Sequence, residues 1–459
     1  MAAETHHIDV IPEDERHGRA RDLFFVWFAA NFNIGNAVFG AVAVFLGNDP
    51  LWAMLAVIVG NLLGGVFMAY HSAQGPQLGV PQLIQSRGQF GYYGALMPVG
   101  LAVLLYGGFF VLTAVIAGQA LTAVFPGLSL DLAIVIGATL SLVLALFGYN
   151  AIHRAAQIGT WPLAIPVVML TVATLGEGTP ELTPSGFQIG PFALAVALSA
   201  TFQLTYAPYV SDYSRYLPSD TKVSATFWWT FLGVTTSVIW TQLIGVLLAF
   251  QFENLTTFDA AKKLLGTNVL TAVILLISGA AIAGNNALNL YGGMLNLVPR
   301  GFKMRALLIL PTFVVGTALA ILASRDFIAT LTNFLSLLQL TFVPWGAINL
   351  TDFYLVKKGR YDVGAFFEPR GPYYRDEASW TFHGIAWKAI LCYLVGIIVQ
   401  VPFLNNAWFK GWLTDPLGGG DFSFIFGLVV PAVLYYVLMR PRRTNVRNAT
   451  ELTEAAGGP

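Results

Sequence analysis

Long apolar segments separated by short polar connections run through almost the whole chain. A helix that crosses a bilayer needs about 20 predominantly apolar residues, and twelve segments approach or exceed that length. They lie at 23–47, 51–72, 95–124, 131–150, 160–176, 191–211, 225–250, 268–292, 306–323, 329–355, 384–403 and 422–439. The pattern predicts an all-α integral membrane protein with about twelve transmembrane helices.

Polar segments mark the limits of this membrane domain. Residues 1–20 and 441–459 are polar tails that we expect to be disordered, and 21–440 form one transmembrane domain. The longest polar connection, 357–383, follows the tenth span, which could be one long broken helix. No second domain is indicated.

Composition and charge place the chain in a membrane and exclude several partners. Hydrophobic residues make up 56% and charged residues 10%, against about 25% charged residues in soluble domains. The net charge is zero, so no nucleic-acid partner is implied. Beyond a small-molecule substrate and the lipid bilayer, the sequence indicates no obligate protein partner.

The distribution of basic residues predicts the orientation. With the N-terminus in the cytoplasm, only Lys262, Lys263, Arg325 and Lys410 of the 24 basic residues lie outside. Because cytoplasmic loops carry an excess of Lys and Arg, we expect both termini to be cytoplasmic in a multi-pass protein of the cell membrane.

Two of the spans carry features that interrupt a helix. The first contains Asn31, Asn33 and Asn36 beside Gly35, and the sixth contains Pro208. For the asparagines of the first span, the alternative is hydrogen bonding to a neighbouring helix. For Pro208, the alternative is a simple proline kink. Broken helices five spans apart instead indicate a five-plus-five inverted repeat with substrate at the midplane. The repeats would cover about 21–176 and 191–355, with two extra helices at about 384–439.

Two other spans place polar or aromatic side chains on a common helix face. In the third span these are Tyr106, Phe109, Phe110 and Thr113, spaced i, i+3, i+4, i+7. In the eighth span, Asn285 and Asn289 share a face and Asn286 lies next to Asn285. Packing between helices is the alternative for the aromatic stripe, whereas three amides with glycines suggest the wall of a pocket.

Asp212 and Arg215 are spaced i, i+3 at the predicted cytoplasmic end of span six. We expect them to form an ion pair or a gate. Asp212 is also the only acid that we expect near the core.

Several motifs give the chain a family resemblance over about 20–440. They are WFAANFNIG, GPQLGVPQLIQSRGQFGYYG, GGFFVLTAVIAGQAL, YAPYVSDYSRYLP, GNNALNLY and INLTDFYLVKKGRYD. The chain resembles the nucleobase:cation symporter family, which carries cytosine, purines, uracil, allantoin, hydantoins and thiamine, and it looks closest to the purine-cytosine permease branch. The resemblance implies a leucine-transporter-like fold that works by alternating access.

The resemblance also implies a substrate site. In the family, a planar base stacks between aromatic residues of spans three and six, and amides read its edge. The matching positions are Asn33, Phe109, Thr113, Gln203 and Asn289. Phe109 replaces a common tryptophan, and Thr113 a common amide. Gln203 stands where an aromatic is frequent, and Tyr206 one turn later could supply that ring.

A cation site is implied at positions where this sequence departs from the family. The family binds sodium with carbonyls matching Ala29, Phe32 and Ala280, and with two hydroxyls matching Ala283 and Gly284. Neither of the last two residues carries a hydroxyl, and a hard cation requires oxygen ligands. Proton coupling is therefore the better expectation, as in the fungal purine-cytosine permeases, with sodium coupling as the alternative.

A channel and a membrane enzyme are the two alternatives to a transporter. A channel would need a continuous polar lining, which interrupted helices do not favour. A membrane enzyme would need a metal or an acid–base cluster. We expect neither that nor a cofactor, because the six histidines lie near membrane edges or outside and Cys392 is the only cysteine. Within the transporter class, the alternative substrate is a vitamin-like, allantoin-type or hydantoin-type ring.

Overall fold

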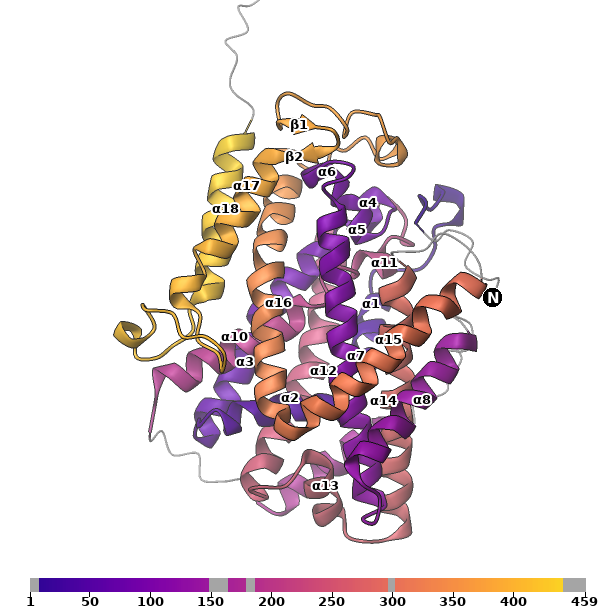
Figure 1. Cartoon of the computed structure of the whole chain (residues 1–459), viewed down its shortest axis with the longest axis vertical. Helices are drawn as coiled ribbons and strands as arrows, with labels where there is room; N and C mark the ends of the chain where they lie inside the picture. The colour runs from indigo at the N-terminus through magenta and orange to yellow at the C-terminus, as the bar shows by residue number, and fades with distance from the viewer. Residues whose placement is uncertain (1–7, 148–163, 179–185, 296–301, 441–459) are drawn as a thin grey trace, which may run out of the picture.

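The computed structural model describes residues 8–147, 164–178, 186–295 and 302–440. They form a bundle of long helices, with a short β-hairpin at one end and the small helix α13 (Thr257–Leu265) at the other (Figure 1). The hairpin pairs β1 (Thr381–Phe382) with β2 (Ile385–Ala386). It belongs to the longest polar connection predicted from the sequence.

The long helices occupy the predicted apolar segments. They are α1 (Asp22–Asn31), α2 (Gly35–Phe45), α3 (Pro50–Ser72), α7 (Leu96–Val124), α8 (Leu130–Phe147), Ala164–Gly176, α10 (Ile189–Leu204), α12 (Val223–Gln251), α14 (Val269–Leu295), α15 (Phe302–Ala323), α16 (Phe327–Leu350), α17 (Trp387–Ile398) and α18 (Ser423–Met439). Among the described residues, five helical runs can cross a membrane by length and composition, or six with α1 and α2 counted as one bent span. Other apolar helices are 10–17 residues long, so twelve crossings stay a prediction.

Short helices connect the long ones at the end of the molecule that carries the hairpin. They are α4 (Gly75–Leu78), α5 (Gln82–Gln85), α6 (Arg87–Phe90) and α11 (Ser211–Ser214) (Figure 1). At this end α16 also continues into a π-helical turn, η3 (Thr351–Val356). The tenth span is thus one long helix whose last turns widen.

The predicted interruption of the first span is present between α1 and α2, whose axes differ by 65°. The three asparagines provide hydrogen bonds that an unwound stretch otherwise loses. Asn31 Nδ2 donates to the Trp27 carbonyl at 3.0 Å, Asn33 Nδ2 to Ala30 at 3.3 Å, and Asn36 Nδ2 to the Asn31 carbonyl at 2.6 Å. Because an unpaired buried backbone group is costly, these amides stabilise the break.

The second interruption follows α10, which ends at Leu204. Pro208 lies four residues later, where its ring clashes with the carbonyl of residue i−4 in a continuous helix and it lacks an amide donor. Residues 205–210 are therefore turns before α11 begins. Both broken helices expected from the sequence are observed.

The helices form two groups, each drawn from both halves of the chain. In one group α10 packs on α3, and α12 packs on α1, α2 and α3; in the other, α7, α8, α14 and α15 pack together. At the α2–α12 crossing, a Cβ on Gly40 would lie 1.9 Å from the Gln242 carbonyl oxygen. Only glycine permits this approach of two backbones. The mixing of halves fits a five-plus-five arrangement.

The N-terminal tail differs from the expectation of disorder. Residues 8–20 are part of the described structure, and Ile11 is buried with its amide donating to the Gly79 carbonyl at 2.9 Å. Arg16 donates to the carbonyls of Ile11 and Pro76. The buried Ile11 side chain and Arg16 thus anchor a polar segment for which the hydrophobic pattern predicts no structure. Residues 1–7 and the tail at 441–459 lie outside the described residues.

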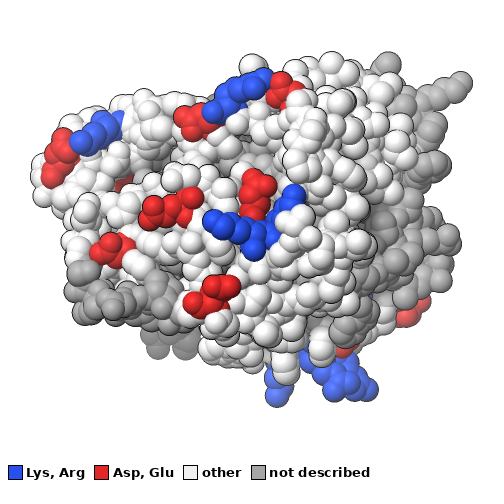
Figure 2. All heavy atoms as spheres, turned by 90° about the horizontal axis from the view of Figure 1, so that it is seen from below, with Lys and Arg blue, Asp and Glu red and all other residues white. Residues whose placement is uncertain are grey.

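Charged residues are sparse on the face seen in Figure 2, where basic and acidic residues lie beside one another. Arg325 forms an ion pair with Asp131 at 2.6 Å, and Lys410 pairs with Asp415 at 2.5 Å. Three of these four side chains are more than half exposed, so such pairs contribute little to stability.

Candidate functional site

Aromatic side chains from the first, third and sixth spans meet at one buried cluster. Leu23, Trp27, Met68 and Phe202 belong to the cluster, and Phe109, Tyr206 and Tyr209 pack against it. Phe109 also touches the two largest apolar clusters of the molecule and meets Phe334 of α16 edge to face, with ring centroids 5.5 Å apart. It therefore lies where the helix groups join.

The break in span one and the break in span six are linked directly. The Tyr206 hydroxyl donates to Asn31 Oδ1 at 2.6 Å, and the Tyr206 ring lies edge-on to Trp27 at 5.7 Å. Tyr206 thus combines a fixed polar end with an aromatic ring that packs against the same buried cluster as Phe109. Such an amphipathic ring can contact a planar ligand without leaving a buried hydroxyl unpaired.

The asparagines of α14 have different roles. Asn286 is fully buried and donates to the Phe110 carbonyl of α7 at 3.1 Å, and Asn289 Nδ2 donates to Asn286 Oδ1 at 3.0 Å. Asn289 Oδ1 accepts no hydrogen bond from the described residues, whereas Asn285 is exposed. Asn286, which the sequence pattern placed among the amides of a pocket wall, instead holds Asn289 in place.

The other predicted site residues, Thr113, Gln203 and Asn33, lie in three different surroundings. The Thr113 hydroxyl, half-buried on α7, makes no hydrogen bond to another described residue. Gln203 is fully buried and donates to Asn61 of α3 at 3.1 Å, while its Oε1 has no partner among the described residues. Asn33 lies in the span-one break itself. Gln203 thus contacts α3 through its amide nitrogen, so only its Oε1 is available to a ligand.

The candidate cation site lies where α14 faces the break in span one. Gly35 at the break packs closely against the Ile282 side chain of α14, since a Cβ on Gly35 would lie only 3.3 Å from it. Among described residues no backbone amide across the break bonds to the carbonyls of Ala29 or Phe32. The carbonyl of Ala283 accepts from the Ser141 hydroxyl of α8 at 2.8 Å. Ala280 and Gly284 lie one turn apart on the same helix.

Asp212 and Arg215 flank the end of α11 and contact different segments. Asp212 Oδ1 accepts from the Gln82 backbone amide at 3.0 Å. Arg215 is buried and donates to the Asp9 carbonyl of the N-terminal segment at 3.2 Å. Both residues therefore tie the end of span six to neighbouring chain, and their pairing with each other stays a prediction.

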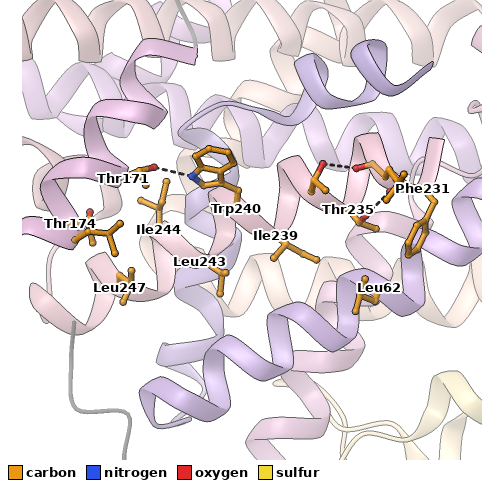
Figure 3. Close-up of a pocket in the computed structure, with 13 residues that line it drawn as sticks. Leu62, Thr171, Thr174, Phe231, Thr235, Ile239, Trp240, Leu243, Ile244 and Leu247 are labelled. Atoms are coloured by element: carbon orange, nitrogen blue, oxygen red, sulfur yellow. Dashed lines mark hydrogen bonds between the residues drawn. The ribbon is translucent and has the colours of Figure 1, made fainter. Parts of the chain in front are cut away.

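A groove of about 590 Å³ opens between α3, the helix Ala164–Gly176 and α12 (Figure 3). The Trp240 indole donates to Thr171 at 2.9 Å, and the Thr235 hydroxyl donates to a carbonyl of its own helix. The hydroxyls of Thr171, Thr235 and Thr236 are engaged, and only that of Thr174 has no partner among the described residues. The walls of the groove are otherwise apolar. Such a groove suits an acyl chain better than a polar heterocycle, which needs hydrogen-bond partners.

Two buried carboxylates correct the expectation that Asp212 is the only acid near the core. Asp352 in η3 is 0% exposed and Asp421 before α18 is 1% exposed. Asp352 stands inside the apolar run INLTDFYLV, and an acid in a predicted span is a signal for function by default. That signal was readable in the sequence, but the donors around Asp352 come from distant segments and were not.

The donors around the two carboxylates differ. Asp421 accepts from the backbone amides of Asn405 and Ser423 at 3.0 and 2.9 Å. Burial raises the pKa of the Asp421 carboxyl, against the hydrogen bonds with Ser423 and Asn405, which lower it. Asp352 accepts from the hydroxyls of Tyr361 and Tyr435 at 2.5 and 3.0 Å. Burial, together with the Asp352 charge, raises the pKa of the Tyr361 phenol well above its usual value, which keeps that phenol a donor.

Comparison with known proteins gives a consistent result. Residues 10–414 match the family described as permeases for cytosine/purines, uracil, thiamine and allantoin. A putative purine-cytosine permease of Bacillus subtilis is 38% identical over 96% of this chain and 97% of its own.

Two solved structures share the fold. The inward-facing conformation of Mhp1 has a TM-score of 0.73 and 19% identity, over 96% of this chain and 94% of that one. Mhp1 in a closed conformation with bromovinylhydantoin bound, described as a nucleobase-cation-symport-1 family transporter, has a TM-score of 0.70 and 20% identity over 95% of each chain. The chain is accordingly a multi-pass membrane transporter with a leucine-transporter-like fold, not an enzyme. It belongs to the family of permeases for cytosine, purines, uracil, thiamine and allantoin.

Proposed function

We propose that this transporter imports a nucleobase or a related planar heterocycle of the cytosine and purine class by proton-coupled symport across the cell membrane, with both termini in the cytoplasm. The observation that carries the substrate class is that Phe109 and Tyr206 pack against one buried cluster beside two broken helices. Aromatic faces there suit a flat ring, and the similar chain of Bacillus subtilis is described as a putative purine-cytosine permease.

The residues proposed to bind the substrate combine rings with unused hydrogen-bonding groups. Phe109 and Tyr206 supply the faces, and Asn289 supplies an acceptor held in place by Asn286. Asn33, Thr113 and Gln203 complete the proposed site. Thr113 and Gln203 each retain a polar atom that no described residue satisfies, which is the condition expected where a ligand supplies the missing partner.

Proton coupling is supported by the missing hydroxyls at Ala283 and Gly284. Three neutral carbonyls, those of Ala29, Phe32 and Ala280, would bind sodium poorly. The sodium alternative needs another oxygen, and Ser141 is the hydroxyl already placed beside Ala283. Ser141→Ala should then abolish sodium-driven uptake if sodium is the coupling ion and leave proton-driven uptake unchanged if it is not.

An uptake competition panel in cells that express only this transporter tests the substrate class. Labelled cytosine and hypoxanthine are offered with an excess of unlabelled adenine, uracil, allantoin, hydantoin, thiamine or pyridoxine. We expect cytosine and purines to compete. Competition by thiamine or pyridoxine alone would support the alternative of a vitamin-like ring, and uptake that does not saturate would contradict a transporter mechanism.

A further inference from the structure

Asp352 is a buried carboxylate whose hydrogen bonds come only from neutral side chains. It accepts from Tyr361, from Tyr435 of α18 and from Gln89 Nε2 of α6, the last at 3.3 Å. None of the ion pairs formed by the described residues includes it. A buried acid without an ion-pair partner is costly to keep charged. Asp352 is therefore not buried as one half of a structural ion pair.

The donors around Asp352 can all reorient. A charged carboxylate only accepts, whereas a protonated one must also donate. Phenol hydroxyls can rotate and an amide can turn over, so Tyr361, Tyr435 and Gln89 can accommodate either form. The donors to Asp421 include two backbone amides, which are fixed in direction. Asp421 is therefore held in one orientation beside the start of α18, and Asp352 is suited to change its protonation state.

A chain of buried amides leads away from Asp352, and every member donates toward it. Asn349 Nδ2 donates to Gln89 Oε1 at 3.3 Å, Gln74 Nε2 to Asn349 Oδ1 at 2.8 Å, and Gln82 Nε2 to Gln74 Oε1 at 3.1 Å. These four amide side chains are at most 2% exposed. Such a one-directional chain polarises its members toward the carboxylate.

The far end of the chain is span six. The Ser211 hydroxyl of α11 lies 2.5 Å from Gln82 Oε1 and donates to it or to the His71 carbonyl, and the Gln82 backbone amide donates to Asp212. Ser211 follows the turn that carries Tyr206 and Tyr209. The chain therefore connects the end of α16 to the broken helix that carries part of the proposed substrate site.

We propose that Asp352 is the group that binds and releases the coupling proton, and that the direction of the Gln89–Asn349–Gln74–Gln82 chain reports its protonation state to α11. When Asp352 gains a proton from water on one side, it becomes a donor to Gln89 Oε1, so Gln89 turns over and the amides behind it follow. Release of the proton on the other side restores the original direction. This inference rests on the proposed proton symport and names its ion site.

Other ionisable groups face Asp352 from the elements packed around it. They are Lys357 at the end of η3, Tyr361 and Tyr373 in the following connection, and Tyr435 on α18. Asp352 is the only carboxylate among them. Phenols ordinarily have pKa values far above neutral pH, so the carboxylate is the acid of this set suited to take up and release a proton.

The test compares Asp352→Asn with Asp421→Asn in proteoliposomes, using labelled cytosine. Asparagine keeps the size of the side chain but cannot carry the proton. We expect Asp352→Asn to retain cytosine binding and exchange of internal for external cytosine, and to lose more than tenfold of the accumulation driven by a pH gradient. Asp421→Asn should keep both.

Failure of the inference and of the proposed function can be told apart. Full pH-driven accumulation in Asp352→Asn would overturn the inference while leaving the transport function standing. Absence of cytosine or purine exchange in the unmodified protein would overturn the function itself. If Asp352→Asn is not inserted, Asp352→Glu serves instead: a displaced pH dependence of uptake supports the inference, and an unchanged one overturns it.

Discussion

The proposed substrate site and the chain that ends on Asp352 use buried polar groups in opposite ways. In the substrate site, Asn289 Oδ1 and Gln203 Oε1 accept nothing from the described residues. Along the chain behind Asp352, the oxygen and the nitrogen of each amide are both engaged. Since unsatisfied buried groups are costly, the first pattern is expected where a ligand binds.

The second pattern is expected where a structure must hold two arrangements. A chain of amides in which every donor and acceptor is paired can point either way with the same number of hydrogen bonds. A single proton at its end then selects the direction. We therefore expect changes in the substrate site to alter affinity without altering coupling, and changes near Asp352 to do the reverse. The predictions below test that separation, from the largest expected effect to the smallest.

Asn289→Ala should have the largest effect on affinity. It removes an acceptor from a partly buried position, and loss of a paired group on ligand binding costs about 1–3 kcal/mol or ~5- to 150-fold in affinity. The measurement is the Kd for cytosine in purified, correctly inserted protein. Asn285→Ala is the matched control, because Asn285 lies on the same helix but is exposed. An unchanged Kd in Asn289→Ala would remove this residue from the site.

Phe109→Leu should weaken binding by about 0.5–1.5 kcal/mol, because it keeps apolar volume but loses the flat face used for stacking. Phe110→Leu provides the contrast, since Phe110 is fully buried against Gly316 of α15. It should lower thermal stability with little change in Kd. Equal effects of both variants on stability, with affinity intact, would identify Phe109 as a packing residue.

Tyr435→Phe removes one donor from Asp352 and nothing from the substrate site. Loss of a neutral hydrogen bond of about 1 kcal/mol corresponds to somewhat less than one pH unit. The lost donor stabilised the charged carboxylate, so the pH midpoint of driven uptake should move upward by roughly that amount. The Kd for cytosine at saturating protonation should stay constant, and a change confined to Kd would contradict the separation.

Asp421→Asn should have the smallest effect, and on stability alone. Because the folded protein raises the pKa of Asp421, its contribution to stability is full below the ordinary carboxyl value of about 4 and declines as pH rises through the folded-state pKa. The melting temperature of the unmodified protein, relative to Asp421→Asn, should therefore fall as the pH rises above about 4. The opposite trend would show that its hydrogen bonds outweigh its burial.

The sequence predicted the helices and both breaks for local physical reasons. Apolar length sets the helix positions, and Pro208 ends α10 four residues upstream. The N-terminal segment was expected to be disordered because its anchors, Ile11 and Arg16, are isolated in a polar stretch. Packing of such single residues cannot be read from a hydrophobic pattern.

Of the chain of amides that ends on Asp352, only Asp352 itself could be predicted from the sequence. An acid within an apolar run is visible in sequence, but Gln74 and Asn349 are 275 residues apart, and Asn349 and Gln89 are 260 apart. Similarly, Asn289 was expected from the family resemblance, whereas its support by Asn286 and the Phe110 carbonyl required the packing of α14 on α7. Long-range partners of polar side chains depend on the assembled fold.

The most direct test of proton-coupled heterocycle transport is uptake of labelled cytosine into proteoliposomes, with a pH gradient and a sodium gradient imposed separately. The hydroxyl-free positions Ala283 and Gly284 and the carboxylate of Asp352 predict accumulation with the pH gradient alone and none with the sodium gradient alone. Accumulation driven by sodium that persists when the pH gradient is collapsed would contradict the account.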